Sequence, residues 1–286
     1  MTVTYRFIDN EEDLLDSCQQ FSSAAWLAVD TEFERVSTYF PELCLIQISN
    51  GIDTVVIDPL TITNLGPLLD LLYKESITKV FHSARQDLEL FFHMKGKVPT
   101  PLFDTQLAAA LLGYAKGIGY GNLIREVLNI ELEKGHARTD WKRRPLTDEQ
   151  LKYAADDVIY LAKVYEIFMV RLKEINNLNA LDEQHASLCR VETYLPDPDK
   201  IWKKIFAARR LNGEKQEIIR KLVAWRENTA REKNRPRKWI VPDHVLVEVA
   251  KRLPNSKEEL LRIDKVGEKT VNRYGDELLE IINTTK

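Results

Sequence analysis

The chain has 286 residues, of which 30% are charged and 44% are hydrophobic, a composition typical of a globular protein rather than a disordered or membrane-embedded one. Its three cysteines are widely spaced and form no CxxC pair, which argues against a disulfide framework and a zinc site. The acidic first residues do not have the pattern of a signal peptide, and no apolar run is long enough to span a membrane, so we expect a cytoplasmic location without membrane attachment.

The charge is divided unevenly along the chain. Residues 200–286 hold 22 Lys and Arg against 13 Asp and Glu, a net charge of +9, whereas residues 1–199 carry −12. This asymmetry indicates two domains with different tasks, and a basic domain in an otherwise acidic protein often binds a polyanion. A Lys- and Arg-rich helical surface that is only solvated would give the same balance, so the charge alone leaves both interpretations open.

The front part of the chain alternates between strand-like and helix-like segments. Apolar, β-branched runs predict strands, and helical apolar spacing predicts helices. In chain order the expected elements are a strand at 5–8, a helix at 10–21, strands at 27–33, 43–49 and 54–59, a helix at 65–74, a strand at 79–82, a helix at 83–94 capped by Ser83, and an almost wholly helical pattern from 103 onward. This order predicts an α/β fold with a mixed sheet covered by helices.

A domain boundary is expected at residues 194–200, YLPDPDK, where two prolines interrupt the helical pattern. The later segments all have helical patterns and are separated by loops that contain Pro or Gly, which predicts a small all-α domain. We therefore expect a sheet-containing domain at 1–195, a linker and connecting helix at 196–212, and a helical domain at 213–286.

Two acids interrupt the apolar strand LAVDTEF at 27–33. Because alternate residues of a strand point to the same face, Asp30 and Glu32 would stand side by side and repel each other. A third acid, Asp87, follows the strand at 79–82 and lies early in the next helix. All three acids thus lie in or close to predicted strands of the sheet.

A further acid lies in the helix of LTDEQLKYAADDVIYL. Thr147 and Gln150 have the spacing of a capping box, which predicts that the helix begins there. Tyr153 and Asp157 are four residues apart and therefore share one face. Asp156 is a competing candidate, but it lies toward a more polar side, whereas Asp157 borders the apolar stripe of the helix.

Each acid alone has an ordinary explanation as a cap or a solvated residue. Together, carboxylates near strand ends and on adjoining helices, without basic partners in the same segments, are typical of a site for hard divalent cations. Oxygen ligands without His or Cys favour Mg²⁺ or Mn²⁺ over zinc. A cation bound between Asp30 and Glu32 would offset their repulsion.

Several blocks of the sequence, taken in order, resemble a known enzyme family. The order DTE, HSARQD and YAADD resembles the DEDD superfamily of 3′–5′ exonucleases, in the subgroup with a tyrosine before the last aspartate. The longer blocks DTEFERVSTYFPELCLIQI, FDTQLAAALLG and RTDWKRRPLTDEQLKYAADDVIYL are similar to the ribonuclease D family over nearly the whole chain. Residues 213–286 resemble one copy of the helicase-and-ribonuclease-D C-terminal (HRDC) domain, a nucleic-acid-binding module, while well-known family members carry a second, diverged copy.

The resemblance implies a ribonuclease H-like mixed sheet with flanking helices, followed by the all-α HRDC domain. It also implies a 3′–5′ exoribonuclease that uses two divalent cations, Mg²⁺ or Mn²⁺, and releases nucleoside 5′-monophosphates from RNA, with transfer-RNA precursors and other structured RNA 3′ ends as substrates. By position, Tyr153 would orient or deprotonate the attacking water, and the YxxxD spacing of the family selects Asp157 over Asp156. The implied metal ligands are the four carboxylates of Asp30, Glu32, Asp87 and Asp157.

Two further stretches are candidates for RNA contacts. The loop HARTDWKRRP at 136–145 precedes the helix of Tyr153 and is either a phosphate-binding loop or a solvated basic loop. Tyr39 and Phe40 follow the first acid pair and would either stack a terminal base or belong to the core. The basic residues predicted to contact RNA are Arg138, Lys142, Arg143 and Arg144.

Two other functions compete with this prediction. A DNA-directed 3′–5′ exonuclease would use the same carboxylate chemistry, and the contacts to a 2′-hydroxyl that separate RNA from DNA cannot be located in the sequence. A non-catalytic nucleic-acid-binding scaffold would be free to lose one of the acids or the tyrosine. None is lost, which argues against the scaffold.

Overall fold

The structure is a computed structural model that describes residues 4–133, 135, 139–175 and 178–285. It divides into two compact units. The first comprises Met1–Glu34 and Pro41–Tyr194, and the second comprises Arg35–Phe40 and Leu195–Lys286. The first unit therefore ends inside the segment in which the sequence predicts a boundary, and six residues from the front of the chain belong to the second unit.

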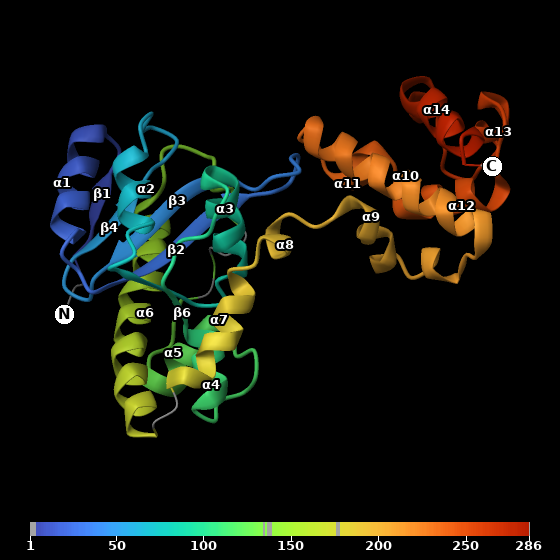
Figure 1. Cartoon of the computed structure of the whole chain (residues 1–286). Helices are drawn as coiled ribbons and strands as arrows, with labels where there is room; N and C mark the ends of the chain where they lie inside the picture. The colour runs from blue at the N-terminus through green and yellow to red at the C-terminus, as the bar shows by residue number, and fades with distance from the viewer. Residues whose placement is uncertain (1–3, 134, 136–138, 176–177, 286) are drawn as a thin grey trace. The chain divides into compact units, whose positions relative to one another are not determined.

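A six-stranded mixed sheet forms the centre of the first unit (Figure 1). The strands are arranged in the order β1-β4-β3-β2-β5-β6, in which β3 is antiparallel to both of its neighbours and the other pairs are parallel. The strand bounds are β1 (Arg6–Ile8), β2 (Trp26–Glu34), β3 (Glu42–Ser49), β4 (Thr54–Ile57), β5 (Thr78–Phe81) and β6 (Leu102–Asp104). The predicted mixed sheet is thus confirmed.

Helices cover both faces of this sheet. Apolar residues of α1, α2 and α3 pack on one face, and those of α4, α5 and α6 pack on the other. The bounds of these and the following short helices are α1 (Glu11–Phe21), α2 (Gly66–Leu72), α3 (Arg85–Lys95), α4 (Thr105–Leu111), α5 (Tyr120–Leu128), α6 (Asp148–Glu174), the 3₁₀ turn η1 (Leu178–Leu181), α7 (Asp182–Leu188) and α8 (Val191–Tyr194). No helix in the described part of the chain is both long enough and apolar enough to cross a membrane.

The side-chain alternation along β2 determines where its acids lie. Leu27 and Val29 are buried in the core under α1, α2 and α3, whereas Ala28 is buried against the helices of the opposite face. Asp30 and Glu32 continue the series of Ala28 and therefore point toward the α6 side. Thr31 continues the series of Leu27 and Val29. The predicted placement of the two acids on one face of a strand is confirmed.

The structure differs from two local predictions. The almost wholly helical pattern expected from residue 103 onward begins later in the chain, because Leu102–Asp104 forms the edge strand β6, parallel to β5. Ser83 was expected to cap α3, but it has a left-handed backbone with φ of 61°, and the cap residue Ala84 makes no side-chain cap hydrogen bond. Instead, the Asp104 carboxylate accepts hydrogen bonds from the backbone N–H groups of Ser83 and Ala84. A contact between distant segments has replaced the local cap.

The second unit is helical around its own core, as predicted. Its longest helix, α10, lies in contact with α9, α12 and α14. The bounds of its elements are α9 (Pro198–Ile201), the 3₁₀ turns η2 (Trp202–Lys204) and η3 (Ala208–Arg210), α10 (Gly213–Glu232), α11 (Arg237–Ile240), α12 (Asp243–Arg252), α13 (Lys257–Leu261) and α14 (Glu268–Asn283).

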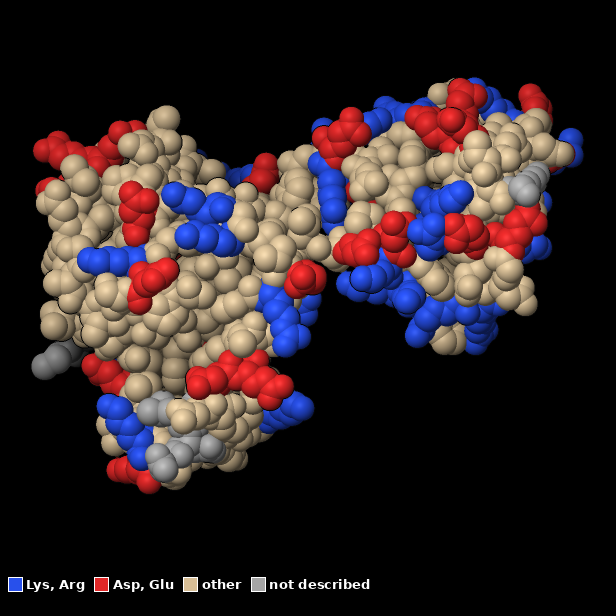
Figure 2. All heavy atoms as spheres, viewed as in Figure 1, with Lys and Arg blue, Asp and Glu red and all other residues tan. Residues whose placement is uncertain are grey.

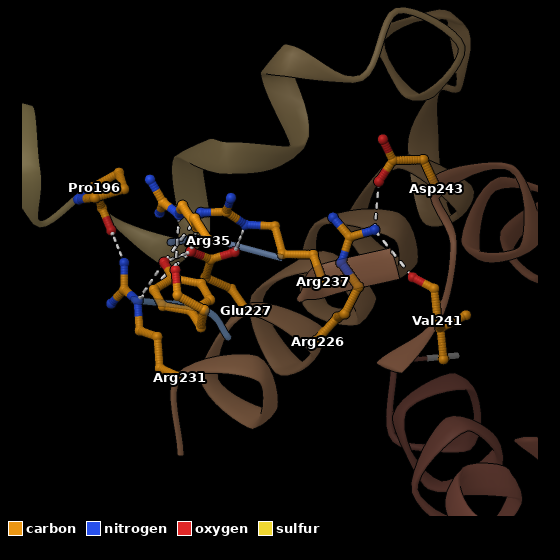
Figure 3. A network of polar contacts seen from close by, with 9 residues as sticks. Arg35, Pro196, Arg226, Glu227, Arg231, Arg237, Val241 and Asp243 are labelled. Carbon is orange, nitrogen blue, oxygen red and sulfur yellow. Dashed lines mark hydrogen bonds and ion pairs between the residues drawn. The ribbon is translucent and has the colours of Figure 1, made fainter. Parts of the chain in front are cut away.

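The segment Arg35–Phe40 belongs to this helical unit through a buried polar network (Figure 3). The Tyr39 hydroxyl donates to the carboxylate of Glu227, whose residue has no exposed surface, and accepts hydrogen bonds from Arg231 at 3.1 Å and Arg237 at 3.0 Å. Arg237 also donates to both oxygens of the Glu227 carboxylate. The buried charge of Glu227 is therefore balanced by two guanidinium groups, and their hydrogen bonds hold the phenol in place.

Candidate active site

The site is built where β2 faces α6. The helix begins at Thr147, whose side chain forms the predicted capping box with Gln150. Helix α6 packs on β2, β3 and β4, so its inward face reaches the acids of β2. One carboxylate oxygen from each of Asp30, Glu32 and Asp157 lies within 4.8 Å of the other two. Residues far apart in the chain thus form one acidic cluster.

Burial and mutual repulsion set the electrostatics of this cluster. Burial first, and the charge of Asp157 second, raise the pKa of Asp30 well above its usual range. The pKa of Glu32 rises to about 10 through burial and the neighbouring acids, and burial raises that of Asp157 to about 8. No Lys or Arg forms an ion pair with these three acids among the described residues. The described protein therefore offers these acids no cationic side chain, and the backbone hydrogen bond from Thr31 to Asp30 only partly offsets their repulsion.

Asp87 approaches the cluster from the other face of the sheet. It lies in the first turn of α3, is 7% exposed, and accepts a hydrogen bond of 2.5 Å from the Thr31 hydroxyl. Burial and the charge of Asp30 raise its pKa well above the usual range. It does not share the tight cluster formed by the other three acids, although its charge is felt by Asp30 and Glu32.

Tyr153 lies one helical turn before Asp157 and is half-buried. Burial, followed by the charges of Asp157, Glu32 and Asp30, raises the pKa of its phenol. Tyr153 and Asp157 both line a cavity of about 360 Å³ whose other wall comes from residues 119–122, 125, 131–133 and 135. This volume is within the range of small-ligand sites, so the tyrosine and the acid face a space of the size that a small ligand occupies.

The structure places the two adjacent aspartates of α6 in different environments. Asp157 belongs to the cluster, whereas Asp156 forms an ion pair of 2.9 Å with the exposed Lys152. The polar side of α6 therefore holds Asp156 and the inner side holds Asp157, as the helical pattern predicts.

Two neighbouring residues were missed by sequence reasoning. The Tyr120 hydroxyl donates to the backbone carbonyl of Asp157 and so fixes α6 at the cluster. Gln47 pairs with Asp30 in the β2–β3 register, has no exposed surface, and its amide atoms have no hydrogen-bond partner among the described residues. A single amide inside the apolar run LCLIQIS was a signal for Gln47, whereas the role of Tyr120 depends on a contact 37 residues away.

The basic residues of the loop before α6 have different environments. Arg144 donates to both carboxylate oxygens of the buried Asp58, at 2.5 and 2.7 Å, and to three backbone carbonyls, which occupies all five of its N–H donors. This arrangement replaces the predicted phosphate contact with a structural role for Arg144. Lys142 pairs with Glu42, Arg143 is exposed, and Arg138 lies outside the described residues.

The sequence left two roles open for Tyr39 and Phe40, stacking on a base or packing in the core. In the structure the two residues have different environments. Tyr39 is 6% exposed and its hydroxyl is used by the network around Glu227. Phe40 is half-buried and packs against the core of the helical unit. Tyr39 is therefore a core residue of the second unit and has no exposed face on which a base could stack.

The donor set fits divalent cations. All three side chains of the cluster are carboxylates, which hard cations such as Mg²⁺ and Mn²⁺ prefer, and a bound cation would relieve the repulsion among them. Among the described residues no His or Cys belongs to the cluster, which favours these cations over zinc.

Comparison with known proteins now adds to this geometry. The sequence model of the 3′–5′ exonuclease domain matches residues 5–173, and that of the HRDC domain matches residues 215–282. Ribonuclease D of Pseudomonas paraeruginosa is 40% identical over 280 residues, which cover 97% of this chain and 73% of that protein. The chain belongs to the ribonuclease D family.

Solved structures agree with this assignment. The crystal structure of Escherichia coli RNase D, described as an exoribonuclease involved in structured RNA processing, has a TM-score of 0.92 and 33% identity, and the match covers 99% of this chain and 75% of that one. The catalytic core of RRP6 from Trypanosoma brucei, with a TM-score of 0.75 and 24% identity, shares the fold. The predictions of a ribonuclease D-type 3′–5′ exoribonuclease with an HRDC domain, and of an RNA substrate, are thereby confirmed.

Proposed function

We propose that this ribonuclease D family member removes nucleotides from RNA 3′ ends at the cluster of Asp30, Glu32 and Asp157, with Asp87 assisting. The observation that carries the proposal is the packing of three carboxylate oxygens within 4.8 Å without a cationic partner among the described residues. We propose Mg²⁺ or Mn²⁺ as the two cations, which the carboxylates of Asp30, Glu32 and Asp157 would hold.

When bound, the cations would supply Lewis-acid activation of water and stabilisation of the leaving 3′ oxygen. The protein's own contribution is to position the reactants. Asp87, which accepts a hydrogen bond from Thr31, would help to hold the second cation from the other side of β2. The raised pKa of Tyr153 keeps its phenol protonated near neutral pH, so the hydroxyl would orient the attacking water through hydrogen bonds instead of ionising.

The cavity beside Tyr153 and Asp157 would receive the terminal nucleotide, and hydrolysis would release a nucleoside 5′-monophosphate. We propose transfer-RNA precursors and other structured RNAs with 3′ extensions as substrates. This proposal is supported by the similarity to Escherichia coli RNase D, whose description names structured RNA processing. The cytoplasmic location stays a prediction of the sequence.

The test is incubation of the purified protein with a 3′-extended RNA and with the matching DNA, each with Mg²⁺ or Mn²⁺. We expect stepwise shortening of the RNA and release of mononucleotides. Asp30→Asn keeps the shape of the side chain but removes its charge, so hydrolysis should fall by about three or more orders of magnitude while RNA binding persists. Retention of about a tenth of the activity would contradict the metal role of Asp30, and equal shortening of DNA would contradict the proposed RNA substrate.

A further inference from the structure

The segment that connects the two matched domains is ordered on the helical unit. Neither family match includes residues 174–214. Within this segment, α9, η2 and η3 all contact α10, and Ile201 and Ala208 are buried in the core of the unit. The residues between Lys200 and Gly213 therefore form a fixed surface and not a loose tether.

This surface is strongly basic. Lys203, Lys204, Arg209 and Arg210 are exposed and form no ion pair with any described residue, and no acid occurs between Lys200 and Glu214. Figure 2 shows Lys and Arg gathered over the part of the helical unit where the segment from α9 to α10 runs. An exposed concentration of positive charge without local compensation attracts a polyanion.

An aromatic ring lies in the middle of these charges. Phe206 is 61% exposed, the guanidinium carbon of Arg210 lies 4.3 Å from its ring centroid, and that of Arg209 lies 5.5 Å away. A guanidinium that stacks on a ring keeps N–H groups at its edge for phosphate oxygens. Solvation alone would explain the four cations, but it does not explain an apolar ring held exposed among them. We call these five residues, Lys203, Lys204, Phe206, Arg209 and Arg210, the connecting patch.

We propose that the connecting patch binds single-stranded RNA of the substrate, with an unpaired base on the Phe206 and arginine stack and the backbone phosphates on the lysines and arginines. Combined basic and aromatic surfaces bind single strands in this way. A duplex keeps its bases stacked on each other and offers no free base face to the ring, so unpaired RNA is the matching ligand. The proposal rests on the proposed function for the identity of the substrate.

The test measures RNA affinity in full-length protein carrying Asp30→Asn, so that RNA is not degraded. The probes are an oligouridine of about twenty nucleotides and a blunt hairpin RNA, each titrated across a salt series. The variants K203Q/K204Q and R209Q/R210Q remove patch charges. K251Q/R252Q is the matched control, because it removes the same charge from an exposed pair on α12 that is already bonded to Glu248.

We expect each patch variant to flatten the slope of log affinity against log salt by about 1.4 for oligouridine, two phosphate contacts at about 0.7 each, and the control to leave it unchanged. Phe206→Leu should weaken oligouridine binding roughly 5- to 150-fold, the loss of one base stack, and hairpin binding by less than about twofold. Equal slopes in patch and control variants, or equal losses for both RNAs in Phe206→Leu, would overturn the proposal.

A separate readout keeps this proposal apart from the proposed function. Without the Asp30→Asn change, Phe206→Leu and the parent chain should hydrolyse a trinucleotide at the same rate, because so short a substrate does not need the patch. Failure of the parent chain to hydrolyse any RNA would refute the proposed function and leave the binding result standing. Thermal unfolding of each variant serves as the folding control.

Discussion

At the scale of single residues, the site depends on carboxylates that the fold holds together against their own repulsion. Neighbouring acids raise the pKa of Glu32, and burial raises that of every acid in the cluster. The folded chain without cations therefore binds protons there more tightly than the unfolded chain. Protons and cations compete for the same carboxylate oxygens. Changes of pH and of metal concentration therefore both test the electrostatics of the cluster.

The first residue-scale prediction concerns Tyr153. Tyr153→Phe removes only the hydroxyl that would orient the attacking water, so turnover of an RNA oligonucleotide should fall about a hundred- to ten-thousand-fold. Calorimetric titration with Mn²⁺ should show nearly unchanged affinity, because no carboxylate is lost. Loss of Mn²⁺ binding in this variant would show instead that the tyrosine helps to build the metal site.

The second concerns the stability of the metal-free protein. Because the pKa of Asp157 is raised to about 8 and that of Glu32 to about 10, the unfolded chain ionises these acids first as pH rises. The contribution of these two acids to the free energy of unfolding in chelator should therefore be highest at and below about pH 4 and fall as the pH rises toward 8. Melting temperatures measured across this range would show the decline, and added Mn²⁺ should raise them most at the high-pH end.

Adjacent aspartates provide the control for this measurement. Asp157→Asn removes one buried, repelled charge, so its melting temperature in chelator should depend less on pH than that of the parent chain. Asp156→Asn changes a half-buried acid that is paired with the exposed Lys152 and should keep the parent's dependence. A parent chain whose stability in chelator rises steadily from pH 5 to pH 8 would contradict the electrostatic account of the cluster.

At the scale of helices and strands, local sequence patterns predicted the features that depend on residues close together in the chain. The capping box of Thr147 and Gln150 gave the start of α6, and strand alternation gave the common face of Asp30 and Glu32. The sequence could not show that Asp104 would take over the cap expected of Ser83, because the two lie 21 residues apart. No local sequence pattern predicts that Asp157 lies beside the acids of β2. Only the resemblance to the family implied that these residues belong to one site.

The same limit applies to Arg144, and it leads to a prediction. Arg144→Ala leaves the carboxylate of Asp58, which is 1% exposed, without its guanidinium, so the free energy of unfolding should fall by about 3 to 5 kcal/mol. Chemical denaturation would measure the loss. Arg143→Ala, an exposed neighbour, should cost less than about 0.5 kcal/mol. If Arg144→Ala retained full stability but flattened the salt dependence of RNA binding, the phosphate role first predicted for Arg144 would be restored.

At the scale of the whole molecule, the two units divide the chain's charge and its chemistry. All of the clustered acids lie in the sheet-containing unit, whereas the net charge of residues 200–286 is +9. The composition indicated two domains of opposite charge, and the structure divides the chain into two compact units. The composition could not predict that Arg35–Phe40 would join the helical unit, because the reason is a hydrogen bond from Tyr39 to a residue 188 positions later.

A chain that ends at Pro196 tests this division. It should bind long structured RNA more weakly than the full chain, with a salt slope flattened by about 0.7 to 0.9 for each phosphate that the helical unit would otherwise neutralise. It also lacks Glu227, Arg231 and Arg237, so Tyr39 has none of its hydroxyl partners. Trypsin should then cleave after Arg35 in the short chain but not in the full one, as mass spectrometry of the fragments would show. Equal salt slopes, or equal protection of Arg35, would contradict these roles of the helical unit.

The attachment of Tyr39 to Glu227 also has a consequence during synthesis of the protein. The ribosome must add 188 residues after Tyr39 before its carboxylate partner exists, which takes about 10 to 40 s at 5 to 20 residues per second. Throughout that interval the turn between β2 and β3 carries an aromatic side chain with no site to occupy, next to the strand that bears Asp30 and Glu32. During synthesis there is therefore a period in which the sheet can form but the turn between β2 and β3 cannot yet pack, because the helices that bind Tyr39 have not been synthesised.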